Sequence, residues 1–205
     1  MRAIEAVIFD WGGVLIANPT ANIIAYCARA LGVPENEYRN ATAAHIAGFQ
    51  KGAITEQGFW ERVCRHLGRV CPGRSLWGEA FRAAYAPIEE VFSLAAALHR
   101  SGYKLGVLSN TEAPCIKFFH EPRYAIFGVK VLSCEAGAVK PEDDIYRIAL
   151  QRLGTEAAKT VFIDDVMANV AGAKDAGMKG ILFKNPAQVE KELDALGVRL
   201  GGEGS

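Results

Sequence analysis

The 205-residue sequence predicts an α/β fold in which a helical insertion follows the first strand of a five-stranded parallel sheet. Half of the residues are apolar, which is enough to form a buried core. Five short runs rich in branched and aromatic residues have the length of buried strands, and helical patterns separate most of them. About ninety residues lie between the first two runs, whereas a simple crossover needs only about a dozen or more.

The predicted strands alternate with helices, which is typical of a parallel, doubly wound sheet. The strands are predicted at residues 6–9, 105–108, 129–132, 161–163 and 180–183. Helical patterns precede the second, fourth and fifth strands at residues 91–99, 144–153 and 170–176.

The long interval after the first strand has amphipathic helical patterns of its own. Gly- and Pro-containing breaks separate them, and Thr55 has the features of a helix cap. We therefore expect a core of residues 1–16 and 87–200, a helical cap of residues 17–86, and a flexible tail at 201–205. The cap helices are predicted at residues 20–31, 35–49, 55–67 and 76–84.

Charge and cysteine content narrow the class of protein. Lys plus Arg (23) equals Asp plus Glu (23), so the chain lacks the basic surface typical of proteins that bind nucleic acid or anionic membranes. A small-molecule partner is expected, and a monomer and a homodimer both stay open. Neither a signal peptide nor a run of about 20 apolar residues is present, so we expect a cytoplasmic protein. Five unpaired cysteines indicate buried free thiols in a reducing compartment: Cys27, Cys64, Cys71, Cys115 and Cys134.

Polar side chains follow four of the five predicted strands. In an open α/β sheet, ligands bind beyond the carboxyl ends of the strands, so these side chains are expected to face one crevice. Each of them alone is more often a helix cap, a turn or a solvated loop residue. Their joint arrangement favours a functional site. They are Asp10 after the first strand, Ser109 and Asn110 after the second, Lys140 after the third, and Asp164 and Asp165 after the fourth.

This set of residues suits phosphoryl transfer, which needs charge neutralisation and in-line positioning. Asp10 can act as a carboxylate nucleophile that attacks phosphorus. A Mg²⁺ ion held by Asp10, Asp165 and Asp164 would reduce the repulsion between this carboxylate and the phosphate, and Mg²⁺ prefers oxygen ligands. Gly12 and Gly13 let the backbone approach the ligand closely.

The remaining candidates would bind phosphate. Lys140 would neutralise negative charge on the phosphate and on the nucleophile, and Ser109 and Asn110 would donate hydrogen bonds to phosphate oxygens. Trp11, next to the nucleophile, either shapes the pocket wall or packs beneath the cap.

The sequence resembles the haloacid dehalogenase-like superfamily, in the subclass with an α-helical cap after the first motif. The similarity extends to about residue 197 and is carried by four motifs in order. They are residues 7–14, 105–110, 137–142 leading to Ile145 and Tyr146, and 162–165 with Asn169 and Ala173 following.

The resemblance implies a Rossmann-like core, a nucleophilic Asp10 and a mobile cap that closes over the substrate. It also implies Mg²⁺ held by Asp10, the backbone carbonyl of Gly12 and Asp165, with Asp164 close by. Asn169 is either a residue that supports this motif or a plain helix position.

One departure from the family pattern is Gly12. Phosphatases of the family usually carry there a second aspartate, which serves as general acid and base. General acid–base catalysis contributes about 10² to 10⁴-fold, so its loss leaves a slow phosphatase of small phosphate monoesters, such as a sugar phosphate. A dehalogenase acting on carbon and a non-catalytic phospholigand-binding protein are the two alternatives.

The predicted cap residues are less informative about substrate. Any of five polar side chains could face the crevice, although each is more often a solvated or core-edge residue. Phe59 and Trp60 are expected in the apolar interior of the cap. The five polar candidates are His45, His66, Arg39, Gln50 and Arg62.

Overall fold

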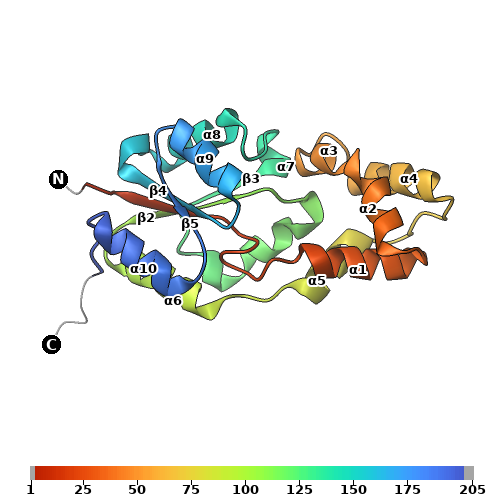
Figure 1. The fold of residues 1–205 in the computed structure, drawn as a ribbon, viewed down its shortest axis with the longest axis horizontal. Helices are drawn as coiled ribbons and strands as arrows, with labels where there is room; N and C mark the ends of the chain where they lie inside the picture. Colours follow the sequence, from red (N-terminus) through yellow and green to blue (C-terminus); the bar gives the residue numbers. More distant parts are fainter. Residues whose placement is uncertain (1–2, 201–205) are drawn as a thin grey trace.

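A computed structural model describes residues 3–200 and contains a five-stranded sheet in the order β3-β2-β1-β4-β5 (Figure 1). All neighbouring strands are parallel, so the predicted α/β fold and parallel sheet are confirmed. Because β1 is central, its carboxyl end has a neighbouring strand on each side. The strands are β1 (Ala6–Phe9), β2 (Lys104–Ser109), β3 (Val129–Leu132), β4 (Thr160–Asp164) and β5 (Lys179–Leu182).

Helices cover both faces of the sheet (Figure 1). Side chains of successive strand residues point to opposite faces, so Val7 and Phe9 belong to one apolar cluster and Ile8 belongs to the other. The first cluster contains side chains of α6 (Glu89–Arg100) and α10 (Pro186–Ala195), and the second those of α8 (Asp143–Leu153) and α9 (Met167–Asp175). This burial on both faces explains the nearly continuous apolar strand sequences.

Five helices follow β1 and extend beyond the carboxyl ends of the strands, at the right of Figure 1. We call them the cap helices. They share an aromatic core in which Phe59 stacks on Phe49 at 4.7 Å between ring centroids, and Trp77 meets both rings edge-on. Phe59 and Trp60 are buried there, as expected. The cap helices are α1 (Thr20–Leu31), α2 (Glu35–Ala43), α3 (Ile46–Gln50), α4 (Glu56–Leu67) and α5 (Leu76–Ala84).

The prediction of one helix over residues 35–49 is wrong, because α2 ends at Ala43 and α3 begins at Ile46. The Thr42 hydroxyl donates to the backbone carbonyls of Tyr38 and Arg39, at 3.1 and 3.0 Å. A threonine that bonds back in this way slightly destabilises and bends a helix, and Thr42 lies one residue before the end of α2. α10 was not predicted, although Asn185 caps it and Pro186 occupies its first position.

Two paired segments connect the cap helices to the sheet. The amide of Ala17 donates to the carbonyl of Ala86 at 2.8 Å, and the amide of Ile88 donates to the carbonyl of Leu15 at 2.9 Å. The segment that leaves the core after β1 and the segment that returns to it before α6 therefore pair with each other.

The cysteines correct one expectation. All five are free thiols, and Cys27, Cys64 and Cys115 are buried as predicted. Cys134 is half-buried, and Cys71 is exposed because it lies in the loop between α4 and α5. Across residues 3–200, no helix has the length and apolar character needed to span a membrane. The predicted flexible tail, 201–205, lies outside the described residues.

Candidate active site

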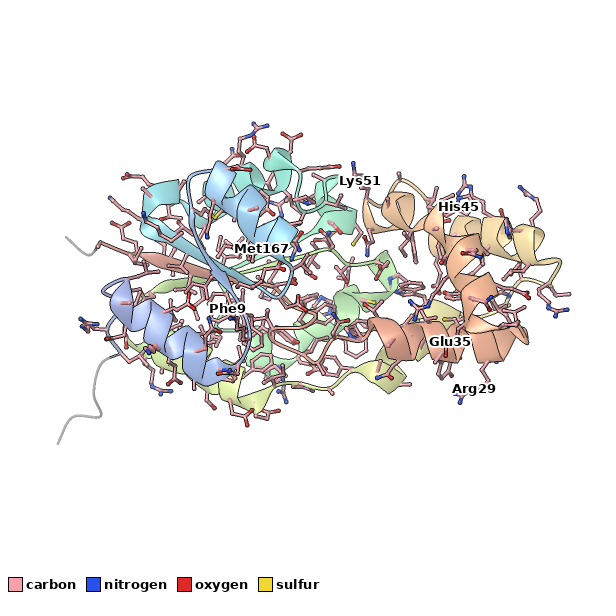
Figure 2. The ribbon with its side chains drawn as sticks, in the orientation of Figure 1. Phe9, Arg29, Glu35, His45, Lys51 and Met167 are labelled. Carbon is pink, nitrogen blue, oxygen red and sulfur yellow. The ribbon has the colours of Figure 1, made fainter. Side chains whose placement is uncertain are left out.

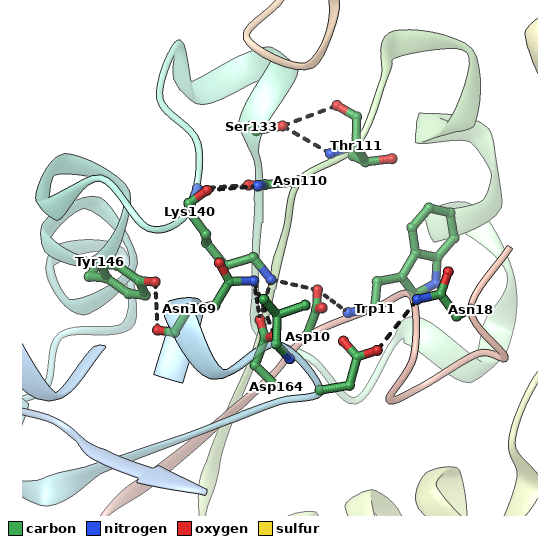
Figure 3. A network of polar contacts seen from close by, with 12 residues as sticks. Asp10, Trp11, Asn18, Asn110, Thr111, Ser133, Lys140, Tyr146, Asp164 and Asn169 are labelled. Atoms are coloured by element: carbon green, nitrogen blue, oxygen red, sulfur yellow. Dashed lines mark hydrogen bonds and ion pairs between the residues drawn. The ribbon is translucent and has the colours of Figure 1, made fainter. Parts of the chain in front are cut away.

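The carboxyl ends of three adjacent strands bring the predicted site residues together (Figure 3). Asp10 follows the central strand β1, Ser109 ends β2, and Asp164 ends β4. Lys140 reaches the same point from the loop between α7 (Ser133–Ala136) and α8. Residues that are far apart in the sequence thus form one cluster at the edge of the sheet.

Lys140 is the buried cation of this cluster. Its Nζ lies 2.7 Å from Asp10 Oδ1 and 2.6 Å from Asp164 Oδ2, and its side chain is 1% exposed. Burial lowers the pKa of Lys140, but the two carboxylates raise it by more, so it ends above its ordinary value. The ammonium therefore stays charged at neutral pH.

Asp10 is buried against this ammonium, and its Oδ1 also accepts a hydrogen bond from the amide of Trp11 at 2.6 Å. Burial raises the pKa of Asp10 to about 7, although Lys140 lowers it, and the nearby Asp164 carboxylate raises it further. Lys140 therefore favours the ionised form of Asp10, which is the state a nucleophile requires.

Asp164 is held in a fixed orientation by the start of α9. Asn169 Nδ2 lies 3.1 Å from each of its carboxylate oxygens, and the amide of Val166 donates to Oδ1 at 2.8 Å. The sequence left Asn169 open between a supporting residue and a plain helix position. Its contacts with Asp164 identify it as a supporting residue.

Three carboxylates form a candidate metal centre. Asp10, Asp164 and Asp165 each have an oxygen within 4.8 Å of the others. Asp165 Oδ1 is buried and has no hydrogen-bond partner within residues 3–200. Burial and the neighbouring Asp164 raise the pKa of Asp165, as expected for a carboxylate that lacks a compensating cation. An oxygen-only donor set with an unpaired buried oxygen fits a hard divalent cation such as Mg²⁺.

Position 13, beside this centre, requires a glycine. Its φ is +96°, and a Cβ at this position would overlap the Asp165 carboxylate. We expect Gly13→Ala to weaken Mg²⁺ binding by about 10- to 100-fold, the usual cost of disturbing a metal ligand's support. Isothermal titration with Mg²⁺ measures the effect.

Gly32→Ala is the matched control for this substitution. Gly32 also has a positive φ (+65°), but its Cβ would meet nothing within 4 Å. This variant carries similar backbone strain and should bind Mg²⁺ like the wild type. Equal affinities of Gly13→Ala and wild type would contradict the assignment of Asp165 as a ligand.

The predicted phosphate-binding residues have different surroundings. Ser109 is buried and lines the cavity above Asp10. The Asn110 side chain holds the Lys140 backbone, since Nδ2 donates to its carbonyl at 3.0 Å and Oδ1 accepts from its amide at 2.8 Å. Asn110 therefore positions the Lys140 loop, while the second hydrogen on Nδ2 stays available for a ligand.

A cavity of about 490 Å³ lies between the cluster and the cap helices, within the usual range for small-ligand sites. Gly12 and Trp11 line it, and the Trp11 ring also stacks on Phe81 at 4.8 Å between centroids. Trp11 therefore both forms part of the cavity wall and packs against the cap helices. Among the cap candidates, Arg39 and Gln50 line the cavity. His45, His66 and Arg62 do not, and Figure 2 shows His45 on the cap helices, away from the strand ends.

Sequence reasoning missed Glu112, which follows β2 three residues after Ser109 and lines the same cavity. Its Oε1 accepts from Gln50 Nε2 and its Oε2 accepts from Trp77 Nε1, both at 3.0 Å. The one sequence signal that could have found it is its closeness to the end of β2, two residues after Asn110. Glu112 therefore links the core to α3 and α5 from within the cavity.

The buried Glu112 predicts a pH-dependent stability. Burial raises its pKa from 4.5 to about 7, although the bonds from Gln50 and Trp77 lower it. The folded state then binds more protons than the unfolded state between these values, so the contribution of Glu112 to stability falls as the pH rises through this window. The loss amounts to about 3 kcal/mol between about pH 4.5 and pH 7.

Urea unfolding of the wild type and Glu112→Gln across this range isolates the effect. The difference in unfolding free energy, wild type minus variant, should decrease as the pH rises. A constant difference would mean that the pKa of Glu112 is the same in both states.

Comparisons with known proteins identify the family. Residues 4–177 match the family model of the haloacid dehalogenase-like hydrolases. The chain is 28% identical over 198 residues to a sesquiterpene phosphatase of Aspergillus oryzae, covering 94% of this chain and 96% of that protein. It is also 28% identical over 209 residues to mouse acyl-CoA dehydrogenase family member 10, covering 95% of this chain but spanning only 19% of that relative's length.

Solved structures share the fold. A hydrolase of the same family from Porphyromonas gingivalis superposes with a TM-score of 0.77 at 25% identity, covering 94% of this chain and 98% of that one. A family enzyme from Bacteroides thetaiotaomicron, solved with magnesium and inorganic phosphate, has a TM-score of 0.71 at 23% identity, covering 88% and 94%. With most of its length matched by the family model, the chain belongs to the haloacid dehalogenase-like hydrolase family.

Proposed function

We propose that this hydrolase is a Mg²⁺-dependent phosphatase of small phosphate monoesters, with Asp10 as its nucleophile. The observation that carries the proposal is the buried Lys140 ammonium between Asp10 and Asp164, beside the unpaired oxygen of Asp165. Such a cluster places a fixed ammonium, and oxygen ligands for a divalent cation, where a phosphate would approach a carboxylate.

The reaction would take place in two steps. An oxygen of Asp10 attacks phosphorus while the bond from phosphorus to the leaving oxygen breaks, and that oxygen takes a proton from water. A second water then attacks phosphorus and loses a proton, and the bond from phosphorus to Asp10 breaks. Inorganic phosphate leaves, and the released proton neutralises the hydroxide formed in the first step. Lys140 and Ser109 stabilise the phosphate oxygens in both steps.

The metal centre would be formed by Asp10, Asp164, Asp165 and the Gly12 carbonyl. When bound there, Mg²⁺ supplies positive charge that offsets the repulsion between the phosphate and the nucleophile. Asn169 keeps Asp164 oriented, and Gly13 leaves room for Asp165. These residues therefore act before any substrate enters, by fixing the ligand positions.

Two similar proteins support a phosphatase that uses magnesium. The Aspergillus relative is described as a phosphatase, and the Bacteroides enzyme was solved with magnesium and phosphate. We further propose that residues 17–86 act as a cap that closes over a small phosphorylated metabolite and excludes water. The balanced charge and free thiols also favour a cytoplasmic protein without a nucleic-acid partner.

The absence of an acid at Gly12 predicts the substrate preference. A Cβ at Gly12 would meet the Pro19 ring at 3.3 Å, so the space beside the backbone is filled by a group that cannot donate a proton. We expect an aryl phosphate to react about 10² to 10⁴-fold faster than a simple alkyl phosphate, because a good leaving group does not need the acid.

Phosphate release from both esters, measured with Mg²⁺ and with EDTA, tests the function. Activity should require Mg²⁺ and should favour the aryl ester. Equal rates for the two esters would mean that another group protonates the leaving oxygen. Full activity in EDTA would contradict the metal centre and favour the second candidate, a dehalogenase, to be tested with a 2-haloacid.

A further inference from the structure

The end of the cavity next to the cap helices contains a carboxylate that the proposed reaction does not use. Glu112 is 6% exposed and lines the same cavity as Asp10 and Lys140. Gln50 and Trp77 occupy two of the roughly four acceptor positions of this carboxylate. Glu112 therefore keeps acceptor capacity on the cavity side.

A second polar group lies near it. Tyr38, on α2, also lines the cavity, and its buried hydroxyl has only the weakly bonding Cys27 thiol as a partner among the described residues. Burial raises the pKa of Tyr38, the Cys27 thiol raises it further, and Glu112, which lines the same cavity, adds a smaller effect. A buried hydroxyl is costly to leave unpaired, so a ligand that bonds it gains affinity.

Four apolar side chains of the cap helices also line the cavity, together with the polar side chains of Thr20, Arg39 and Thr42. The apolar side chains remove apolar ligand surface from water but offer no partner to polar ligand groups. The phosphate-binding residues lie at the other end, next to the strands. The apolar side chains are Ile23, Ile24, Ile46 and Phe81.

We propose that Glu112, together with Tyr38, recognises a hydroxyl on an otherwise apolar leaving group. The inference rests on the proposed phosphatase function and names the substrate class: small phosphate monoesters whose leaving group combines an apolar body with one hydrogen-bond donor. A polyhydroxyl sugar fits less well, because hydroxyls that face the isoleucine and phenylalanine side chains would lack partners. A hydrogen bond to a buried carboxylate gives about 10- to 100-fold discrimination.

The test compares phenyl phosphate with its three hydroxymethyl isomers, whose leaving groups are similar apart from the added hydroxyl. We measure kcat and KM with Mg²⁺ for the wild type and for Glu112→Gln. In the wild type, at least one isomer should exceed phenyl phosphate in kcat/KM by about tenfold, mainly through a lower KM. Glu112→Gln should reduce this ratio about tenfold.

Two control variants separate recognition from cap attachment. Trp77→Phe removes a donor to Glu112 but keeps the carboxylate and an aromatic ring. Lys51→Met removes the 2.6 Å ion pair with Glu142, which links the end of α3 to the core outside the cavity. Lys51 is labelled in Figure 2. Both variants should keep the preference for the hydroxymethyl ester. A purely structural Glu112 would instead make Glu112→Gln and Trp77→Phe affect both esters equally.

Tyr38→Phe provides an independent variant if Glu112→Gln fails to fold, and it should lower the preference by a smaller factor of about two to five. Equal kcat/KM for all four esters in the wild type, or an unchanged preference in the folded Glu112 and Tyr38 variants, would overturn the inference and leave the phosphatase proposal intact. Absence of phosphate release from every ester would contradict the proposed function and the inference with it.

Discussion

Replacing Asp10 with asparagine is expected to lower phosphate release from an aryl phosphate by on the order of 10⁴-fold or more. The amide is a far weaker nucleophile than the carboxylate, and the proposed metal centre would lose one of its three charged ligands. The variant keeps the shape of the side chain, so the fold should persist. Steady-state phosphate release with saturating Mg²⁺ measures the effect.

Asp143→Asn is the control, because Asp143 is an exposed carboxylate in the first turn of α8. Its ion pair with Arg147 is exposed, and the variant should keep wild-type activity. Asp10→Asn activity within tenfold of the wild type would show that another group attacks phosphorus. Circular dichroism of both variants distinguishes a catalytic loss from unfolding.

Replacing Lys140 with methionine is expected to lower the unfolding free energy by about 3 to 5 kcal/mol and to remove most of the activity. The change leaves Asp10 and Asp164 buried and close together without their cation. Protonation of a carboxylate relieves this repulsion, so the loss should be smaller at about pH 5 than at about pH 8. Urea unfolding at both pH values measures it.

Lys51→Met is the matched control for this comparison. Lys51 also forms a short ion pair between a lysine and a carboxylate, but its side chain is 34% exposed and that of Glu142 is 44% exposed. Its loss should cost at most about 1 kcal/mol. Similar costs for the two variants would mean that the buried carboxylates do not depend on Lys140.

The strands and their polar ends could be predicted from the sequence. The residues from Ala6 to Asp10 combine a strand buried on both faces with a charged side chain where it ends, and parallel pairing then places Asp10 beside Asp164. This reasoning needs only the order of elements and the rule that ligands bind at the carboxyl ends of strands.

Features that depend on individual side-chain contacts could not be predicted in the same way. The break after α2 is not marked by a glycine or a proline, and the back-bonded Thr42 hydroxyl beside it is visible only in the structure. α10 buries only Val189 and Leu193, so its apolar pattern is weak. Glu112 appeared to be an ordinary loop residue, because nothing in the sequence indicates that Gln50 and Trp77 enclose it.

The central claim is that phosphorus is transferred to Asp10 during the reaction. The most direct test is to quench the enzyme in acid during turnover of an aryl phosphate with Mg²⁺ and to identify modified peptides by mass spectrometry. The account predicts one phosphoryl group on Asp10 in the wild type, and none in Asp10→Asn or in EDTA. Rapid phosphate release with Asp10 unmodified, and retained in Asp10→Asn, would contradict it.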